Sequence, residues 1–374
     1  MKIVVAMDSF KGSLTAVRAC EIVADAVQAA APGAEVVLKP MADGGEGTAA
    51  ALMTAAGGQW VEQKVMGPLP QMRVHAGFLW LAQDRTAVVE MATASGMQLL
   101  RREQLNPLKT TTYGTGQLIR AAMEFGAERI LLAVGGSATV DGGAGAAAAL
   151  GWRFFDAGGV EVGPGGGELF RIDRIVPPGQ ELHAVVEVLC DVDNPLCGEH
   201  GAAAVYGPQK GATPQMVETL EAGLRHLADL VHAQLGRDLC DLPGAGAAGG
   251  LAAGAVAFMN ARLVSGIDEI MSRSGLRDAV ADADWVVTGE GRFDAQSLRG
   301  KVVSGVTRIA REAGARTAVI AGRVLLPPDA YQPSGIETAL SCMTDGMDLE
   351  VALANSEPLL AQAAREFARK VLEK

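Results

Sequence analysis

Apolar and polar positions divide the first 60 residues into alternating strands and helices. Short apolar runs at Ile3–Ala6 and Val36–Leu38 are typical of buried strands. Between them, apolar residues recur at helical spacing from Thr15 to Ala30, and a second helix is expected to end near Ala56. This β-α-β-α order favours a parallel sheet covered by helices.

The pattern changes after Gly57, where β-like segments follow one another at 60–66, 73–81 and 86–90. Farther along, the spacing predicts mixed elements at 113–125, 129–134, 183–189 and 213–236. Strand-helix alternation returns near Val280, with elements expected at 285–287, 304–313, 317–321 and 356–372. We therefore predict an α/β protein with a discontinuous doubly wound domain (1–60 and 280–374) and an inserted α/β domain (61–279).

Composition and charge narrow the class of protein. The chain has 374 residues, 49% of them hydrophobic, which indicates a folded globular protein. Its net charge of −11 argues against a nucleic-acid partner or an anionic membrane surface. The sequence contains no run of ~18 apolar residues, so we expect no membrane span. It also contains no coiled-coil heptad, so the oligomeric state stays open.

The termini and cysteines bear on location. The N-terminus, MKIVVAMDSF, has a short apolar run that is soon charged, so we expect no signal peptide. The five cysteines are scattered and contain no C-x-x-C pair, which predicts neither a zinc site nor a disulfide framework. A reducing, cytoplasmic location is the expectation.

Polar, glycine-rich loops repeatedly follow the apolar runs, and the clearest lies at 288–294 after the strand expected at 285–287. The others are expected at 7–13, 41–48, 135–145, 190–196 and 206–211. Open α/β sheets build their sites in such loops, at the carboxyl ends of the strands. The loops, with Lys301 just beyond the last, carry acids and cations: Asp8, Asp43, Glu46, Asp141, Asp191, Asp193, Glu290, Asp294, Lys11, Lys210, Arg292 and Lys301.

Carboxylates, cations and glycine N–H groups in shared loops are what phosphoryl transfer requires. Because Mg²⁺ prefers one or two carboxylates plus phosphate oxygens, only some of these acids can be metal ligands. Asp191 and Asp193 alternate along a strand end, so both carboxylates point to one side and need a cation or a proton.

Structural alternatives exist for many of these residues. Asp8 could cap its helix or loop, Asp43 and Asp141 could be turn residues, and Lys11 could be solvated. No P-loop sequence is present. The G-x-G-x-x-G match at 244–249 follows no clear strand, so a tight helix start is the better interpretation. The glycine-rich segment 158–167 is interpreted as an exposed structural turn.

Five segments together resemble the motifs of bacterial glycerate kinases of the glycerate 2-kinase type. They are DSFKGSLTA (8–16), MADGGEGT (41–48), GGSATVDGGAGAAAALG (135–151), CDVDNPLCGEHGAAAVYGPQKGA (190–212) and VTGEGRFDAQSLRGK (287–301). The resemblance implies ATP- and Mg²⁺-dependent phosphorylation of D-glycerate to 2-phospho-D-glycerate, in glyoxylate use or in glucarate and galactarate breakdown. It also implies that the discontinuous domain is flavodoxin-like and that the active site lies in the cleft between the domains.

Residue roles follow as hypotheses from this resemblance. Asp191 is the candidate base, and Asp193 or Asp294 would hold Mg²⁺. Charge neutralisation on phosphoryl oxygens or the substrate carboxylate is expected of Lys11, Lys210 and Lys301. The remaining candidates for substrate or phosphate binding are Asp8, Ser9, Asp43, Gly44, Gly45, Glu46, Ser137, Asp141, Gly142, Glu290 and Arg292.

Other functions stay open on the residues alone. They are a kinase giving 3-phosphoglycerate or using another small hydroxy-acid, a non-catalytic hydroxy-acid sensor, and a phosphate-ester isomerase or lyase. ATP consumption separates the kinase from the last two.

Overall fold

The computed structural model describes residues 1–179, 182–298, 301–344 and 346–372, and it divides into two compact units. The first unit contains Met1–Asp43, Ala50–Gly57 and Ile267–Lys374, and the second contains Gly44–Ala49 and Gly58–Gly266. Arg299 and Gly300, which belong to the last glycine-rich motif, lie outside the described residues.

The first unit is built on a five-stranded sheet in which all neighbouring strands are parallel. Its order is β15-β13-β11-β1-β2, with β1 at Lys2–Met7, β2 at Glu35–Leu38, β11 at Trp285–Gly289, β13 at Arg316–Ala321 and β15 at Ile336–Ser341. Counted from the β2 edge, the order is β2-β1-β11-β13-β15, so β1 lies next to β2 and the later strands follow in chain order. This is the flavodoxin-like strand order. The predicted doubly wound fold is confirmed.

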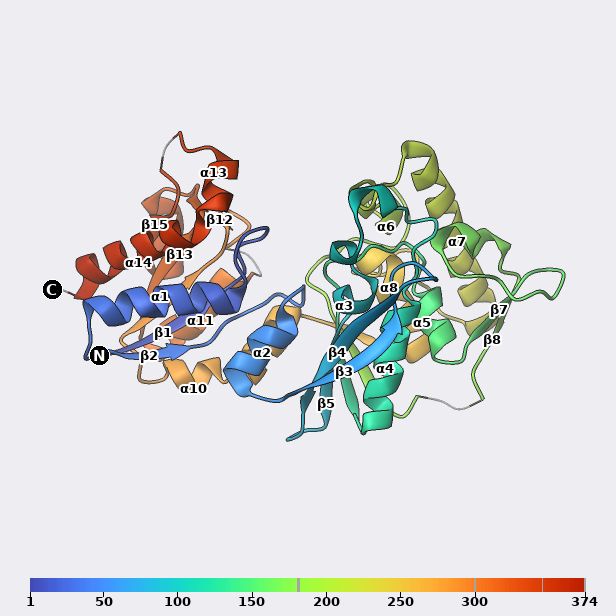
Figure 1. Cartoon of the computed structure of the whole chain (residues 1–374), viewed down its shortest axis with the longest axis horizontal. Coiled ribbons are helices and arrows are strands. Elements are labelled where there is room, and N and C mark those ends of the chain that lie inside the picture. The colour runs from blue at the N-terminus through green and yellow to red at the C-terminus, as the bar shows by residue number, and fades with distance from the viewer. Residues whose placement is uncertain (180–181, 299–300, 345, 373–374) are drawn as a thin grey trace. The chain divides into compact units, whose positions relative to one another are not determined.

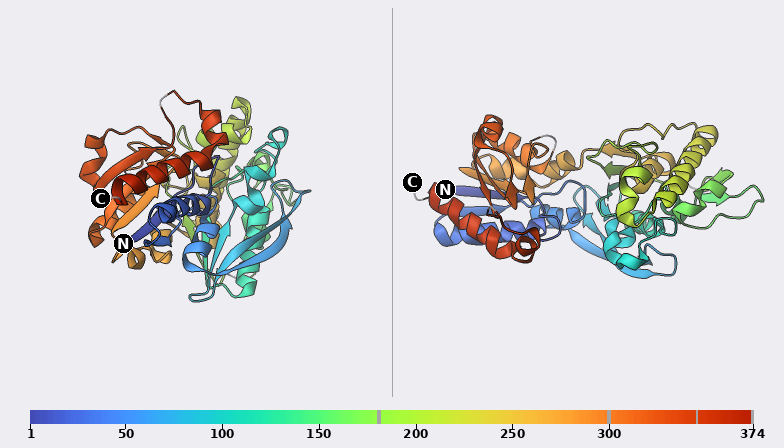
Figure 2. Two further views of the ribbon diagram at one scale, coloured as in Figure 1. Left: turned by 60° about the vertical axis from the view of Figure 1, so that its left-hand side comes forward. Right: turned by 90° about the horizontal axis from the view of Figure 1, so that it is seen from above.

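Helices cover both faces of this sheet because alternate strand residues point to opposite sides. Ile3 and Val5 pack against α1 (Ala16–Ala30) and α14 (Ser356–Leu372), which lie side by side (Figure 1). Val4 packs on the other face against α11 (Val302–Ala313). The views in Figure 2 show the first and last elements, β1 and α14, within this one unit.

The chain enters the first unit for the last time at Ile267, before the predicted position of 280. The cause is the packing of α9 (Gly266–Arg273) and α10 (Leu276–Val280), whose residues Ile267, Met271, Leu276 and Val280 join the core cluster around Val4 and Val286. The segment from Ile267 to Val280 contains helices and no strand. Its sequence pattern therefore does not reveal that it packs on the sheet of the first unit.

The second unit has a six-stranded sheet of order β10-β9-β6-β5-β4-β3. The strands are β3 (Gln59–Met66), β4 (Arg73–Leu81), β5 (Thr86–Glu90), β6 (Arg129–Ala133), β9 (Val185–Leu189) and β10 (Arg262–Val264). β5, β6, β9 and β10 pair in parallel, whereas β3 and β4 form an antiparallel edge.

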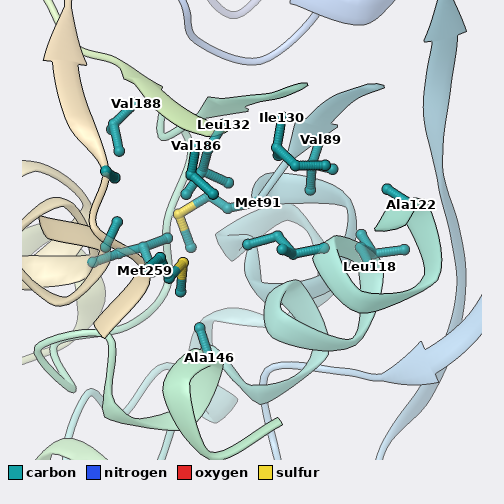
Figure 3. Packing of buried hydrophobic residues seen from close by; sticks show 14 of the residues in the cluster. Val89, Met91, Leu118, Ala122, Ile130, Leu132, Ala146, Val186, Val188 and Met259 are labelled. Atoms are coloured by element: carbon teal, nitrogen blue, oxygen red, sulfur yellow. The ribbon is translucent and has the colours of Figure 1, made fainter. Parts of the chain in front are cut away.

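The core of the second unit lies between its sheet and helices α4 (Tyr113–Phe125), α5 (Ala144–Ala149) and α8 (Ala247–Met259). Figure 3 shows Leu118 and Ala122 of α4 close to Val89 and Ile130 of the sheet. A further cluster packs α6 (Ala202–Tyr206) and α7 (Pro214–Leu235) against α8. Thr213 caps α7 by accepting a hydrogen bond from the N–H of Met216 (3.3 Å), which satisfies a backbone donor in the first turn of the helix.

Two glycine-rich segments have the structural roles expected. At 158–167, Gly158, Gly159 and Gly163 are exposed as predicted, whereas Gly165 and Gly166 are buried, and a Cβ on Gly166 would lie 2.2 Å from the carbonyl oxygen of Val140. At 244–249, a Cβ on Gly246 would lie 2.3 Å from the carbonyl oxygen of Pro195, where α8 begins. Close backbone contact therefore explains Gly166 and Gly246.

Within the described ranges, no helix combines the length and the apolar character needed to cross a membrane.

Candidate active site

A pocket of about 390 Å³ opens in the first unit beside the loops after β1 and β11. Small-molecule sites occupy roughly 300–1,000 Å³, so this pocket has a suitable size for a ligand. The predicted site residues that line it are Asp8, Ser9, Lys11, Asp43, Glu290, Arg292, Asp294 and Lys301. The structure thus brings together residues from three separate glycine-rich segments of the sequence.

The backbone fixes the positions of the two main loops. The N–H of Asp8 donates to the carbonyl oxygen of Gly289 (2.8 Å), which ties the end of β1 to the end of β11. A Cβ on Gly289 would lie 1.7 Å from the carbonyl oxygen of Ile320, so only glycine allows β11 to approach β13 here. These contacts fix the backbone position at the end of β11, where Glu290 follows.

Asp8 lies where negative charge is unfavourable. Burial raises the pKa of its carboxyl to about 7, and the charges of Asp43 and Glu290 add to the shift. The N–H of Ser9, which donates to Oδ1 of Asp8 (2.6 Å), and the charge of Lys11 lower this pKa in part. Asp8 therefore holds a proton or needs a cation near neutral pH.

Glu290 has a similar environment in the same pocket. Burial raises its pKa, the Ser297 hydroxyl and Lys301 lower it, and the negative charge of Asp294 raises it. One carboxylate oxygen of Glu290 is buried without a hydrogen-bond partner. An unpartnered carboxylate oxygen beside other acids fits a divalent cation, since Mg²⁺ binds carboxylate and phosphate oxygens.

The cations of the pocket have different partners. Arg292 is 70% exposed and pairs through Nε with Asp294 Oδ2 at 3.0 Å, so its guanidinium is partly neutralised. Lys11 is exposed. Lys301 precedes α11, where its N–H donates to the Ser304 hydroxyl (3.0 Å). Lys11 and Lys301 are the lysines that line the pocket.

The second unit gathers other predicted residues at the carboxyl ends of its parallel strands. A Cβ on Gly135, after β6, would lie 2.6 Å from Cα of Gly45, so the 44–47 and 135–137 loops are in contact. One on Gly44 would lie 2.7 Å from Cβ of Leu189, the last residue of β9. Gly44, Gly45 and Glu46 therefore lie beside the loop that contains Ser137, at this edge of the sheet.

Asp191 and Asp193 follow β9 and are both exposed. The N–H of Gly266 donates to Oδ1 of Asp191 at 3.2 Å, which orients that carboxylate. Both side chains are therefore accessible to a ligand.

Glu90 is a residue of this edge that the sequence analysis missed. It ends β5, and its buried carboxylate accepts hydrogen bonds from the N–H groups of Gly47 (3.3 Å) and Ala49 (2.5 Å). These bonds hold the 44–49 segment in place. The only signal in the sequence was a carboxylate at the end of an apolar strand.

Asp141, Gly142 and Lys210 lie away from solvent inside the second unit. Asp141 accepts bonds from the N–H (2.8 Å) and the hydroxyl (2.9 Å) of Thr112, and burial raises its pKa. Lys210 is 1% exposed and donates from Nζ to the carbonyl oxygen of Thr139 (2.8 Å), and burial lowers its pKa to about 7.

These contacts favour structural roles for all three residues. The N–H of Gly142 already donates to the carbonyl oxygen of Gly249 (3.1 Å), so it cannot also bind an anion, as the sequence analysis predicted. Asp141 and Lys210 are buried and hydrogen-bonded within the second unit, which does not fit direct substrate contact.

Over the described part of the chain, no three His, Cys, Asp or Glu side chains are grouped as a ready-made metal site. Asp294 belongs to the first unit and Asp193 to the second. A Mg²⁺ ion that takes most of its ligands from phosphate and water needs no such group.

The fold and the pocket define an α/β protein whose site suits a polyanion and a cation. A sequence model described as the glycerate kinase family matches residues 3–372, and the chain belongs to this family. The "Glycerate kinase" of Bacillus subtilis (strain 168) is 43% identical over 374 residues, covering 99% of this chain and 98% of the relative. The "Glycerate 2-kinase" of Escherichia coli (strain K12) is 40% identical over 371 residues, covering 98% and 97%.

A solved structure agrees with these relatives. The crystal structure assigned as glycerate kinase 2 from Salmonella typhimurium LT2 is 41% identical, with a TM-score of 0.84, and the match covers 100% of this chain and 98% of the other. The predicted family resemblance and the prediction of a phosphotransferase are confirmed.

Proposed function

We propose that the protein transfers the γ-phosphoryl group of ATP to the 2-hydroxyl of D-glycerate, giving 2-phospho-D-glycerate and ADP. The observation that carries this proposal is a pocket of acids and lysines in a chain that matches glycerate kinases over nearly its whole length. The 2-position is supported by the name of the Escherichia coli relative.

The first unit supplies charges for the phosphoryl group. Lys11 and Lys301 neutralise phosphoryl oxygens, and Arg292 contributes as far as its pair with Asp294 allows. Asp294 and Glu290 are the acids that would hold Mg²⁺, which supplies charge neutralisation on the phosphate oxygens when bound. Asp8 and Asp43 complete the acidic side of the pocket.

The second unit supplies groups for the acceptor. Asp191 is accessible and oriented by the N–H of Gly266, so it can accept the proton of the 2-hydroxyl during transfer. Asp193 is a second candidate for the metal. Glycerate offers a carboxylate and two hydroxyls, which suit the N–H groups of Gly44 and Gly45 and the side chains of Glu46 and Ser137. Positioning and charge neutralisation carry most of the rate in such reactions.

The phosphoryl donor and the cysteines bear on the cellular location of the protein. We infer a cytoplasmic protein, because ATP is the phosphoryl donor and all five cysteines are free.

The test is ADP release by the purified full-length protein. Samples contain ATP, Mg²⁺ and either D-glycerate, L-glycerate, lactate or no acceptor, and a parallel set contains EDTA. We expect D-glycerate-dependent ADP release that EDTA abolishes. Equal ADP release with and without every acceptor would contradict the proposal, and turnover with lactate but not D-glycerate would replace the substrate.

A further inference from the structure

One wall of the pocket in the first unit is apolar. The short helix α13 (Leu349–Ala354) contributes Leu349 and Leu353 to it, and these side chains are 61% and 39% exposed. Met343 and Leu359 line the same pocket. Asp348 orients α13 by accepting a bond from the N–H of Glu350 (2.8 Å). Because exposed leucines beside a pocket favour a ligand with apolar surface, this wall indicates a ligand that is apolar in part.

The lining also carries several charged side chains, namely the acids Asp8, Asp43, Glu290 and Asp294 and the cations Lys11, Arg292 and Lys301. A ligand that satisfies the whole pocket therefore has a flat or bulky apolar part joined to a polyanion, and it brings a cation for the acids. Glycerate has no apolar part of this kind. A nucleoside triphosphate with its divalent cation has all three features.

We infer that Leu349 and Leu353 bind the nucleoside part of ATP, so that its phosphates extend toward Lys11 and Lys301. This inference rests on the proposed kinase function and adds which side chains contact the nucleoside. Apolar contact of a base with two leucines is non-directional and depends on the surface buried. The two leucines thus contribute affinity for the nucleoside but not for a bare phosphate chain.

The test compares polar substitutions on one helix. Leu349→Ser, Leu353→Ser and the double variant remove the apolar wall, and Val351→Ser is the matched control. Val351 belongs to the same helix and is 53% exposed, but it does not line the pocket. Isothermal titration calorimetry of each full-length protein with Mg²⁺ measures the dissociation constants of ATP and of inorganic tripolyphosphate.

We expect the double variant to bind ATP ~10-fold or more weakly and to bind tripolyphosphate as the wild type does. The KM of the double variant for ATP should rise together with its dissociation constant, while its KM for D-glycerate stays unchanged. The Val351→Ser control should bind ATP as the wild type does. The thermal midpoint of each variant without ligand verifies that the first unit is folded.

Three outcomes would overturn the inference. An unchanged ATP affinity in the double variant removes the leucines from the nucleoside site and leaves the kinase proposal intact. An equal loss of ATP and tripolyphosphate binding would mean that the substitutions disturb the pocket as a whole. A wild-type protein that neither binds nor consumes ATP would refute the proposed function, and the inference would fail with it.

Discussion

The buried charged residues differ in how they affect the stability of the ligand-free protein. Asp8 and Glu290 have raised pKa values because they are buried among other acids, which is unfavourable without a ligand. Such a cost is common where a site is prepared for a cation. Lys210 is also buried, and burial lowers its pKa, but its Nζ donates the hydrogen bond that the buried carbonyl of Thr139 needs. The sequence predicted Lys210 as a site residue together with Asp8 and Glu290, because burial cannot be read from residue type.

Asp8→Asn should stabilise the ligand-free protein at alkaline pH and impair turnover. In the wild type, the folded state keeps the Asp8 proton up to about pH 7, whereas the unfolded chain loses it near 3.8. The stability that Asp8 contributes is therefore complete below pH 3.8 and lost as pH rises to about 7. At pH 8 the variant should exceed the wild type by on the order of 2 kcal/mol in free energy of unfolding.

Urea unfolding at pH 4 and pH 8 measures this difference, which should nearly vanish at pH 4. Asp329→Asn, at an exposed aspartate of the same unit, is the control and should change neither value. Equal stability of wild type and Asp8→Asn at pH 8 would refute the unfavourable charge.

Lys210→Ala should lower stability without a specific effect on ATP binding. The substitution leaves a cavity and removes the partner of the buried Thr139 carbonyl, which should cost roughly 2–4 kcal/mol. The measurements are urea unfolding and the KM for ATP, with the exposed Lys109→Ala as control. A fully stable Lys210→Ala protein with a raised KM for ATP would restore Lys210 as a phosphate ligand.

At the scale of elements, periodicity predicted the strands and helices with the clearest patterns. The helix expected at 113–125 is α4 (Tyr113–Phe125), and the strand expected at 86–90 is β5. Sequence reasoning missed β15 (Ile336–Ser341) and α13, because one is a partly exposed edge strand and the other has exposed leucines. The apolar wall of the pocket therefore could not be predicted, although its charged side could.

Gly289→Ala should disrupt the end of β11. The new Cβ would lie 1.7 Å from the carbonyl oxygen of Ile320, so β11 and β13 would have to separate and Glu290 would move. We expect a loss of on the order of 3 kcal/mol and a large loss of turnover. Gly33→Ala is the matched control, since nothing lies within 4 Å of its added Cβ. A thermal midpoint equal to that of the wild type would show that the strands tolerate a side chain at Gly289.

At the scale of the whole molecule, the change from strand-helix alternation to consecutive β-like segments predicted a discontinuous domain but not its full boundaries. The segment Gly44–Ala49 belongs to the second unit, held there by Glu90 through bonds that join residues about 40 positions apart. No local pattern reveals such a contact. The same holds for Asp141 and Lys210, whose long-range partners Thr112 and Thr139 give them structural roles.

We propose that this molecule phosphorylates the 2-hydroxyl of D-glycerate. ³¹P NMR of the full-length protein with ATP, Mg²⁺ and D-glycerate tests it most directly, with L-glycerate as the control. We expect a growing 2-phosphoglycerate resonance matched by ADP. A 3-phosphoglycerate resonance would contradict the position of transfer, and unchanged ATP with folded protein would contradict the function.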